Sequence, residues 1–300
     1  MTEQEKALIA AWSDHTRMWK NNTWVYPVIS RRAGGLSVGV NLNPDHKCSF
    51  SCVYCQSGPQ DGHPSVPVNV EQIENELRQF LSLYESGKFA KNHFFGNVPA
   101  EKLIIKDICL SGDGESTIVR EFPEVCKVMR QIQKEYQQGH LNSNVAELPS
   151  SFKLRLITNA SRLGSESVQE ALAHLLESDG EIWAKLDAGT EERYKKMNRS
   201  AVPFEKILQN LGSVIKRHPI CIQTMLCDLQ GEIPRDFEID SYVEKLKGIY
   251  SANPANFVEV QLYTVIRQTM QSQVLPLTKE FLENVANRIK DALPIQVRTF

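Results

Sequence analysis

Three cysteines lie close together near residue 50 of this 300-residue chain, in the segment PDHKCSFSCVYCQSG. Cys48, Cys52 and Cys55 have the spacing C-x3-C-x2-C, which allows three thiols to reach one metal centre from the same side. Thiolates prefer zinc, copper(I) and iron-sulfur clusters to hard cations. A structural zinc ion takes four protein ligands, whereas a cubane cluster held by three cysteines keeps one iron without a protein ligand. The number of thiols therefore predicts an iron-sulfur cluster with an open iron.

A zinc site is the alternative that the spacing leaves open. His46 or His63 would then supply the fourth ligand. In that case the chain would be a zinc-binding interaction module instead of an enzyme. The two possibilities differ in the metal that the purified protein contains.

Composition limits the class of protein further. A hydrophobic content of 41% is enough for a substantial core, and a net charge of -2 argues against an indiscriminate nucleic-acid binder. The first residues, MTEQEKALIAAW, match neither a signal peptide nor a membrane span. Seven cysteines, three of them clustered, suit reduced thiols better than a disulfide framework. We expect a cytoplasmic protein that makes no membrane contact.

Short hydrophobic segments alternate with amphipathic ones along most of the chain. The expected strands are residues 38–42, 103–110, 152–158, 181–187, 220–226 and 257–262. The expected helices are residues 2–20, 70–84, 120–137, 166–177, 203–217, 236–249 and 278–292. Repeated βα units with right-handed crossovers form a parallel sheet, and six of them curve into an open barrel. The sequence therefore predicts an α/β fold of the (β/α)6 partial TIM barrel type.

No composition shift divides the chain, so we expect one domain over residues 1–300. Residues 1–30 would be an N-terminal helical extension, residues 31–265 the partial barrel, and residues 266–300 a C-terminal helix and strand. The connections at 87–101 and 138–151 are long enough to be surface decorations or loops that gate a substrate.

Polar residues follow several of the predicted strands, where the loops of a parallel barrel gather. The segment SGDGEST from Ser111 contains Gly114 and Glu115, and a carboxylate beside glycines can accept hydrogen bonds from a ligand ammonium. An ordinary glycine turn that caps the next helix would have the same composition. Asn159, after the next strand, either contacts a cofactor or caps a turn.

The segment EIWAKLD alternates along its strand. Ile182 and Ala184 would face the helices, while Trp183, Lys185 and Asp187 would face the barrel interior. An inward lysine is a candidate catalytic residue, unless its ammonium extends to solvent. Asp187 is a candidate site residue or the N-cap of the helix that begins near residue 191.

The same alternation on other strands predicts a polar layer inside the barrel. Its members are Arg155, Lys185, Gln223 and Glu259. The charges in such a layer must be paired, because unpaired charge in a barrel interior is costly. We expect this layer to bind a polar or anionic substrate.

Tyr54 gives the cysteine segment the form C-x3-C-x-aromatic-C, which resembles the signature of the radical S-adenosylmethionine superfamily. The resemblance implies a four-iron, four-sulfur (4Fe-4S) cluster whose open iron is chelated by S-adenosyl-L-methionine (SAM). One electron from the reduced cluster cleaves SAM to methionine and a 5′-deoxyadenosyl radical, which abstracts a hydrogen atom. The fold implied by the family is a (β/α)6 partial barrel, in agreement with the strand pattern.

The resemblance also implies roles for individual residues. Gly114 and Glu115 are similar to the family's G-x-G-E-P segment, which binds the amino group of SAM, with Ser116 in place of the proline. Thr158-Asn159-Ala160 is similar to the family's T-N-G. The remaining cofactor contacts implied are Tyr54 near the adenine, Asn159 and Asp187 at the ribose or carboxylate, and Gln223 on the adenine side.

Two longer runs, YPVISRRAGGLSVGV and AKLDAGTEERYKKMNRS, resemble the stand-alone relatives of wyosine-type transfer-RNA synthases. Wyosine synthases hold a second cluster with cysteines upstream of the first, and this chain has no cysteine before Cys48. The substrate implied is an RNA nucleoside, a small metabolite or a peptide, and an activator of a glycyl-radical enzyme is a further alternative. A flavodoxin or ferredoxin is the electron donor that the family implies.

Overall fold

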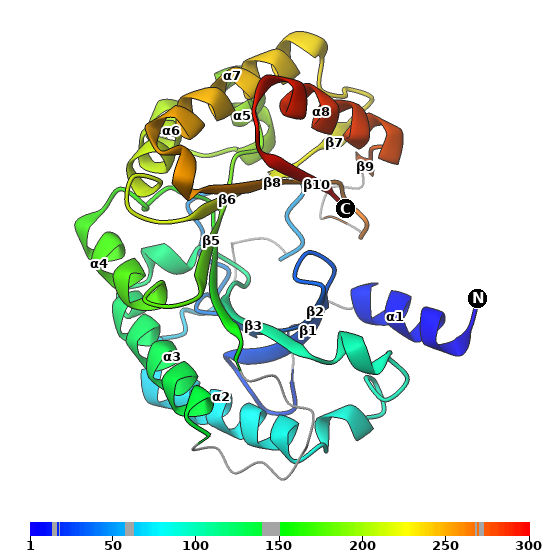
Figure 1. Cartoon of the computed structure of the whole chain (residues 1–300), viewed down its shortest axis with the longest axis vertical. Coiled ribbons are helices and arrows are strands. Elements are labelled where there is room, and N and C mark those ends of the chain that lie inside the picture. The colour runs from blue at the N-terminus through cyan, green and yellow to red at the C-terminus, as the bar shows by residue number, and fades with distance from the viewer. Residues whose placement is uncertain (14–16, 18, 58–62, 140–150, 268, 270–272) are drawn as a thin grey trace.

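Eight strands form one sheet that curves around a central space in the computed structural model of the chain (Figure 1). The structure describes residues 1–13, 17, 19–57, 63–139, 151–267, 269 and 273–300. The strand order is β1-β2-β3-β4-β5-β6-β8-β10; β1 is antiparallel to β2, and each further neighbouring pair is parallel. The sheet strands are β1 (Val25–Ser30), β2 (Gly35–Val40), β3 (Ile105–Leu110), β4 (Lys153–Thr158), β5 (Gly180–Lys185), β6 (Ile220–Met225), β8 (Phe257–Tyr263) and β10 (Gln296–Thr299).

Helices cover the outer, convex side of this sheet, and the inner side faces the central space (Figure 1). The α-helices are α1 (Glu3–Ser13), α2 (Val70–Glu85), α3 (Phe122–Gln137), α4 (Glu166–Leu175), α5 (Glu191–Asn198), α6 (Phe204–Val214), α7 (Asp236–Ala252) and α8 (Lys279–Ala292). Short 3-10 turns occur at Phe89–Lys91, Ala100–Lys102, Ser116–Ile118 and Pro254–Asn256. Side chains of Asn69 and Thr278 accept the backbone N–H groups that open α2 and α8.

The predicted partial barrel is confirmed. All six predicted strands are present as neighbours in chain order, and the sheet ends at the edge strands β1 and β10 without closing. The C-terminal helix and strand expected in residues 266–300 are α8 and β10, with β10 parallel to β8.

The helical interpretation of residues 1–30 is correct only for Glu3–Ser13. Val25–Ser30 instead forms β1, which pairs antiparallel with β2. Its sequence, VYPVIS, is rich in β-branched and aromatic residues and buries Val25, Tyr26 and Ile29 against the core. The strand propensity and burial of Val25–Ser30 therefore outweigh the helical pattern seen in the residues before this segment.

The main core lies between the sheet and its helices. Ile182, Ala184 and Leu186 of the β5 segment belong to it, so the predicted outward face of this strand is confirmed. Residues 87–101 also join the core, because Phe89 and Phe95 pack with Trp19. This connection therefore packs on the main core through its buried phenylalanines. Most of the second long connection, 138–151, lies outside the described residues.

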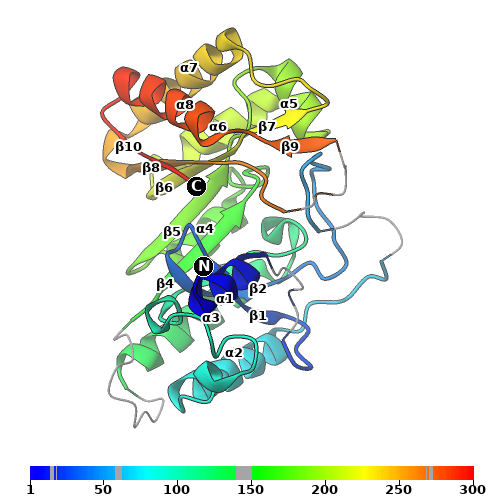
Figure 2. The same ribbon diagram turned by 90° about the vertical axis from the view of Figure 1, so that its right-hand side faces the viewer.

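A second hydrophobic cluster supports the segment after β2. Val53 packs there with Leu229 and Val274 of a small antiparallel ribbon, β7 (Cys227–Leu229) and β9 (Val274–Pro276). Figure 2 shows this segment beside the ribbon, at the carboxyl ends of the parallel strands. The ribbon was not predicted, since each strand has only three residues.

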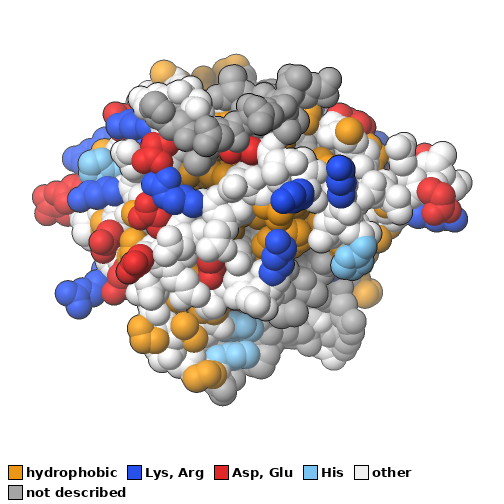
Figure 3. All heavy atoms as spheres, turned by 90° about the horizontal axis from the view of Figure 1, so that it is seen from below, with side chains coloured by type: hydrophobic (Ala, Val, Ile, Leu, Met, Phe, Trp, Pro, Cys, Tyr) orange, Lys and Arg blue, Asp and Glu red, His pale blue; other side chains and the backbone are white. Residues whose placement is uncertain are grey.

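The surface carries charges of both signs. On the face shown in Figure 3, acidic and basic side chains are interspersed, and neither kind forms a continuous patch. None of the helices in the described part of the chain has the length and apolarity needed to cross a membrane.

Candidate active site

One cavity of about 330 Å³ opens inside the curved sheet. We distinguish two parts of it. The cysteine end is lined by Cys48, Cys52, Cys55, Glu115 and Asn159; the hairpin end is lined by Arg31 and Arg32 of the β1–β2 turn together with Trp183 and Tyr263. The turn precedes the first residue of β2 and the cysteine segment follows its last residue, so the two segments start from opposite ends of this strand.

The cysteine segment is held by backbone hydrogen bonds to the end of α5. Ser51 N donates to Asn198 O at 3.0 Å, and Val53 N donates to Met197 O at 2.9 Å. Ser200 Oγ adds a bond of 3.0 Å to the carbonyl of Ser49. These contacts fix the backbone between the first and third cysteines, which is a requirement for a preformed metal site.

Two of the three thiols accept hydrogen bonds from buried amides. Asn159 Nδ2 lies 3.5 Å from Cys48 Sγ, and Asn198 Nδ2 lies 3.4 Å from Cys52 Sγ. Burial raises the pKa of both thiols to about 12, assisted by the Glu115 carboxylate for Cys48 and by Asp187 for Cys52. Metal coordination displaces thiol protons, so loading this site would release them.

The residues present fit a cluster bound by three cysteines. All three thiols line one cavity, and amide donors to ligating sulfurs are a common feature of iron-sulfur sites. His46 and His63, the ligands expected for zinc, stack on each other with ring centroids 3.9 Å apart and do not line this cavity. Within the described residues, no three His, Cys, Asp or Glu side chains are grouped closely enough to hold a single metal ion.

Glu115 is 2% exposed and lines the cysteine end. Its Oε1 accepts from Thr117 N, Thr117 Oγ1 and Thr158 Oγ1, and its Oε2 accepts from Asn159 N at 2.7 Å. Burial raises the pKa of this carboxyl, while these donors oppose the shift. Each oxygen of a carboxylate has about two lone pairs. Oε1 accepts the three bonds from Thr117 and Thr158, whereas Oε2 accepts the bond from Asn159 N and has room for one further donor.

The glycines of the same loop have a packing role. A Cβ on Gly114 would lie 1.9 Å from the carbonyl oxygen of Lys47, and one on Gly112 would lie 2.1 Å from Asn41 Oδ1. Both glycines therefore let the loop after β3 approach the chain that leads into the cysteine segment. Gly114 also lines the cavity, as expected for a residue near a ligand.

Asn159 connects the end of β4 to the cysteine segment, because its Nδ2 also donates to Ser49 Oγ at 3.0 Å. The next residue, Ala160, has a φ of 65°, in the left-handed region that favours glycine. Ala160 therefore occupies this conformation with some strain.

Lys185 points into the barrel, as predicted, and does not extend to solvent. Its side chain is 12% exposed, and Nζ lies 2.7 Å from Asp187 Oδ1 and bonds to the Tyr263 hydroxyl. Burial would lower the pKa of this ammonium, but Asp187 and Tyr263 raise it above its ordinary value. The lysine is therefore held as a cation beside the ring of Tyr54, 5.3 Å from its centroid.

Asp187 is the centre of this group. Oδ1 accepts from Lys185 Nζ and Met225 N, and Oδ2 accepts from Tyr54 OH and Asn198 Nδ2. These four bonds use its ordinary acceptor positions. The alternative role as helix N-cap is wrong, because Thr190 caps α5 by accepting from Arg193 N.

Gln223 does not line the cavity, in contrast to its expected contact with adenine. It is fully buried; its Nε2 donates to Gln261 Oε1 at 2.8 Å, and its Oε1 accepts from Arg32 Nη1 at 3.0 Å. Its role in the structure is therefore to support Arg32. Met225, two residues later on the same strand, lines the cavity in its place.

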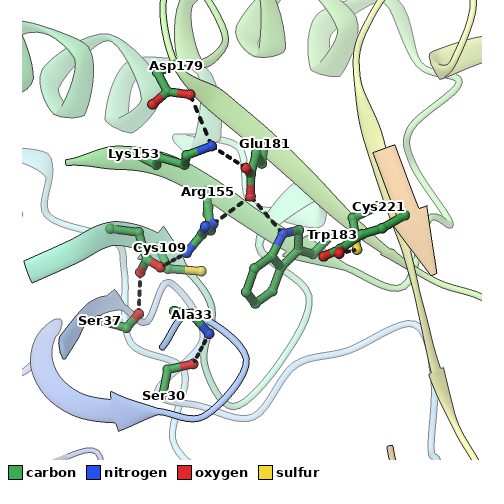
Figure 4. A network of polar contacts seen from close by, with 12 residues as sticks. Ser30, Ala33, Ser37, Cys109, Lys153, Arg155, Asp179, Glu181, Trp183 and Cys221 are labelled. Carbon is green, nitrogen blue, oxygen red and sulfur yellow. Dashed lines mark hydrogen bonds and ion pairs between the residues drawn. The ribbon is translucent and has the colours of Figure 1, made fainter. Parts of the chain in front are cut away.

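The charges of the predicted inward polar layer are paired, and Figure 4 shows Arg155 with its partner Glu181. Arg155 bonds to Asp107 and to Glu181, with Nε 2.9 Å from Glu181 Oε2. Glu259 accepts from Arg298 Nε at 2.6 Å. These partners were missed by the sequence analysis, although Glu181 has the same strand parity as Lys185 and could have been identified.

Comparison with families and curated proteins gives distant relatives only. The scan found no family model that matches the chain. A protein named GTPase Obg from Brachyspira hyodysenteriae is 24% identical over 90% of this chain and 34% of its own length. The UPF0026 protein slr1464 of Synechocystis sp. is 25% identical over 68% of this chain and 62% of its own length. The chain thus spans about a third of the first relative and less than two thirds of the second.

The name of the first relative describes a GTPase, a class of enzyme in which a phosphate-binding loop is common. A phosphate-binding loop of the form G-x4-G-K-S/T is absent from all 300 residues.

Solved structures give a more definite result. A radical SAM methyltransferase from Sphaerobacter thermophilus matches 92% of this chain and 69% of its own, with a TM-score of 0.57 and 13% identity. SuiB of Streptococcus suis bound to S-adenosylmethionine matches 90% and 52%, with a TM-score of 0.56 and 11% identity. TYW1 with a lysine-pyruvate adduct matches 86% and 74%, with a TM-score of 0.53 and 14% identity. The resemblance drawn from the cysteine motif is confirmed at the level of architecture: this chain has the fold of the radical SAM enzymes.

Proposed function

We propose that this protein is a radical SAM enzyme that binds one 4Fe-4S cluster through Cys48, Cys52 and Cys55. The observation that carries the proposal is the lining of a single cavity by all three thiols and by Glu115, at the carboxyl ends of the parallel strands. When bound, the cluster supplies the electron that cleaves SAM to methionine and a 5′-deoxyadenosyl radical. The enzyme would use this radical to take hydrogen from a polar substrate.

Glu115 is proposed to bind the ammonium of SAM through the free position on Oε2. Its other acceptor positions are filled by Thr117, Thr158 and Asn159, which would hold the carboxylate in one orientation. Gly114 lies beside it on the cavity wall, where a side chain would be excluded by Lys47. A prearranged carboxylate loses little conformational freedom on binding, which favours affinity.

Tyr54, Asn159 and Asp187 are proposed to shape the rest of the cofactor site. Tyr54 presents its ring to the cavity, with its hydroxyl fixed by Asp187. Asp187 has its acceptor positions filled, so its proposed role is to position Tyr54 and Lys185. Lys185 is proposed to be a catalytic residue. Its cation lies on the cavity wall, where it would orient an anionic group of SAM or of the substrate.

We also propose an electron donor, a cellular compartment and a substrate class for the enzyme. A flavodoxin or ferredoxin would supply electrons, and a reducing cytoplasm would suit seven cysteines, all of which are unpaired in the structure. An RNA nucleoside or a small metabolite is the proposed substrate. A peptide substrate or a glycyl-radical enzyme as target would require a surface for a protein partner.

The test is reductive cleavage of SAM by the purified protein. Anaerobic reconstitution with iron and sulfide, followed by dithionite and SAM, is expected to yield 5′-deoxyadenosine detectable by mass spectrometry. The variant C48A/C52A/C55A is expected to yield none, whereas C126A, altered at a buried cysteine of α3 outside the cavity, is expected to behave as the wild type. Zinc in the anaerobically isolated protein, with no cluster obtainable, would overturn the proposal in favour of the interaction module.

A further inference from the structure

Two adjacent arginines occupy the turn between β1 and β2. Ser30 Oγ accepts from Ala33 N at 3.1 Å, and Ser30 O accepts from Gly34 N at 2.9 Å. Gly34 has a φ of 81°, which the turn requires and which glycine adopts without strain. The turn is thereby closed, and it presents Arg31 and Arg32 to the cavity.

Arg32 lies among aromatic and amide groups. Its Nη1 donates to Gln223 Oε1, and its Cζ is 4.7 Å from the ring centroid of Tyr263 and 5.8 Å from that of Trp183. Trp183 also lies 4.4 Å from the Cζ of Arg155, and Figure 4 shows its ring beside Arg155 with Ser30 and Ala33 of the turn below. The guanidinium of Arg32 is thus held in one position at the hairpin end.

Three cations in or beside the cavity have a carboxylate partner. Lys185 pairs with Asp187, Arg17 pairs with Asp113, and Arg155 pairs with Asp107. In the described part of the chain, neither Arg31 nor Arg32 has a carboxylate within ion-pair distance. Both are half-buried, and burial together with the neighbouring Arg32 lowers the pKa of Arg31.

Two like charges held together without a counter-ion reduce stability, unless a ligand completes the site. An arginine fork matches the oxygens of a carboxylate or phosphate and binds them in a bidentate manner. The carboxylates that line the cavity are Glu115, Asp187 and Asp107. Each is held by other protein donors, and none forms an ion pair with Arg31 or Arg32.

We propose that Arg31 and Arg32 form a binding site for an oxyanion of the substrate, either a carboxylate or a phosphate, at the hairpin end of the cavity. The inference deepens the proposed function by naming the substrate class: an anionic molecule whose charged group lies on the turn. The rest of the substrate would extend past Tyr263 toward the cysteine end, so that its target C–H lies between the two parts of the cavity. A neutral analogue would leave both guanidinium groups unpaired and would bind weakly.

Arginine footprinting tests the site on the wild-type protein. The cluster-loaded protein is treated with phenylglyoxal, without reductant, in the presence of inorganic phosphate, succinate or SAM, and modified peptides are quantified by mass spectrometry. We expect phosphate or succinate to protect Arg31 and Arg32 while the exposed Arg217, outside the cavity, stays reactive. Preference for phosphate assigns a phosphorylated substrate, and preference for succinate assigns a carboxylate substrate. Protection by SAM alone would assign the arginines to the cofactor and overturn the inference.

Calorimetry provides the matched comparison of variants. R31Q/R32Q is expected to bind the preferred anion about tenfold or more weakly than the wild type, because each charge-assisted bond contributes substantially. K216Q/R217Q removes an equally adjacent cationic pair from the surface and is expected to bind as the wild type does. Circular dichroism shows whether the variants fold, and the footprint of the wild type remains decisive if R31Q/R32Q does not.

The outcomes separate this inference from the proposed function. Protein that produces 5′-deoxyadenosine but shows equal anion binding in all variants, or no protection of Arg31 and Arg32, overturns the anion site alone. Protein that binds the anion through these arginines but never cleaves SAM overturns the proposed function and leaves an anion-binding cavity.

Discussion

The two parts of the cavity differ in how their charges are satisfied. At the cysteine end, the carboxylates of Glu115 and Asp187 each accept four hydrogen bonds or ion pairs from the protein. At the hairpin end, Arg31 and Arg32 face the cavity without a carboxylate partner among the described residues. Carboxylates that several protein donors hold are oriented before a cofactor binds, whereas cations without a carboxylate partner are available to pair with a ligand anion. The difference suggests that the first part is built for a constant cofactor and the second for a substrate.

The largest loss in the free energy of unfolding is expected from the paired polar layer inside the barrel. R155M would leave Asp107 and Glu181 without their shared cation, and loss of one partner of a buried ion pair costs about 3–5 kcal/mol in free energy of unfolding. R31Q/R32Q should leave that free energy within about 1 kcal/mol of the wild type, or raise it, because no ion pair is lost. Urea unfolding followed by circular dichroism measures both. A large loss in R31Q/R32Q would mean that the turn arginines are structural and would remove the contrast.

Glu115 should have an intermediate effect, on SAM binding. E115Q removes the charge that is proposed to meet the ammonium, and a hydrogen bond to a charged group contributes about 1.5–3 kcal/mol. We expect affinity for SAM to fall by about tenfold or more, with the iron content unchanged. Calorimetry on unreduced, cluster-loaded protein measures this.

The matched control for Glu115 is E124Q, which alters an exposed glutamate in the first turn of α3. Its SAM affinity should equal that of the wild type. Unchanged affinity in E115Q as well would assign Glu115 a structural role only, as the support that connects Thr117, Thr158 and Asn159.

The smallest effect is expected at the N-terminus of α5, whose other end holds the cysteine segment. T190A removes the side chain that accepts from Arg193 N, and loss of such a cap costs about 1 kcal/mol. Thermal unfolding of the cluster-free protein measures it. A neutral T190A would contradict the assignment of Thr190 as the cap of α5.

The sequence was sufficient for the barrel and for most of the cysteine end. Alternation along EIWAKLD correctly directed Lys185 and Asp187 inward, because side-chain parity on a strand is a local property. Cys48, Cys52 and Cys55 could be assigned to one site because they lie within eight residues of the sequence. These features needed no knowledge of how distant segments pack.

The hairpin end could not be predicted in the same way. Val25–Ser30 was assigned to a helical extension. Arg31 and Arg32 were therefore placed at the start of the expected barrel but not in the turn of a β-hairpin. Strand parity placed Gln223 on the inward face, and the family resemblance implied a contact with adenine. Neither could show which neighbour occupies the position beside Gln223. Its contact with Arg32 joins residues 191 positions apart, and only the folded chain shows it.

The most direct measurement is electron paramagnetic resonance of the dithionite-reduced cluster before and after addition of SAM. The account predicts a signal from a reduced 4Fe-4S cluster that changes when SAM binds and broadens when the SAM carboxylate carries ¹⁷O, because one iron is left open by the three cysteines. A cluster signal unaffected by SAM, or zinc at this site in place of iron, would contradict it.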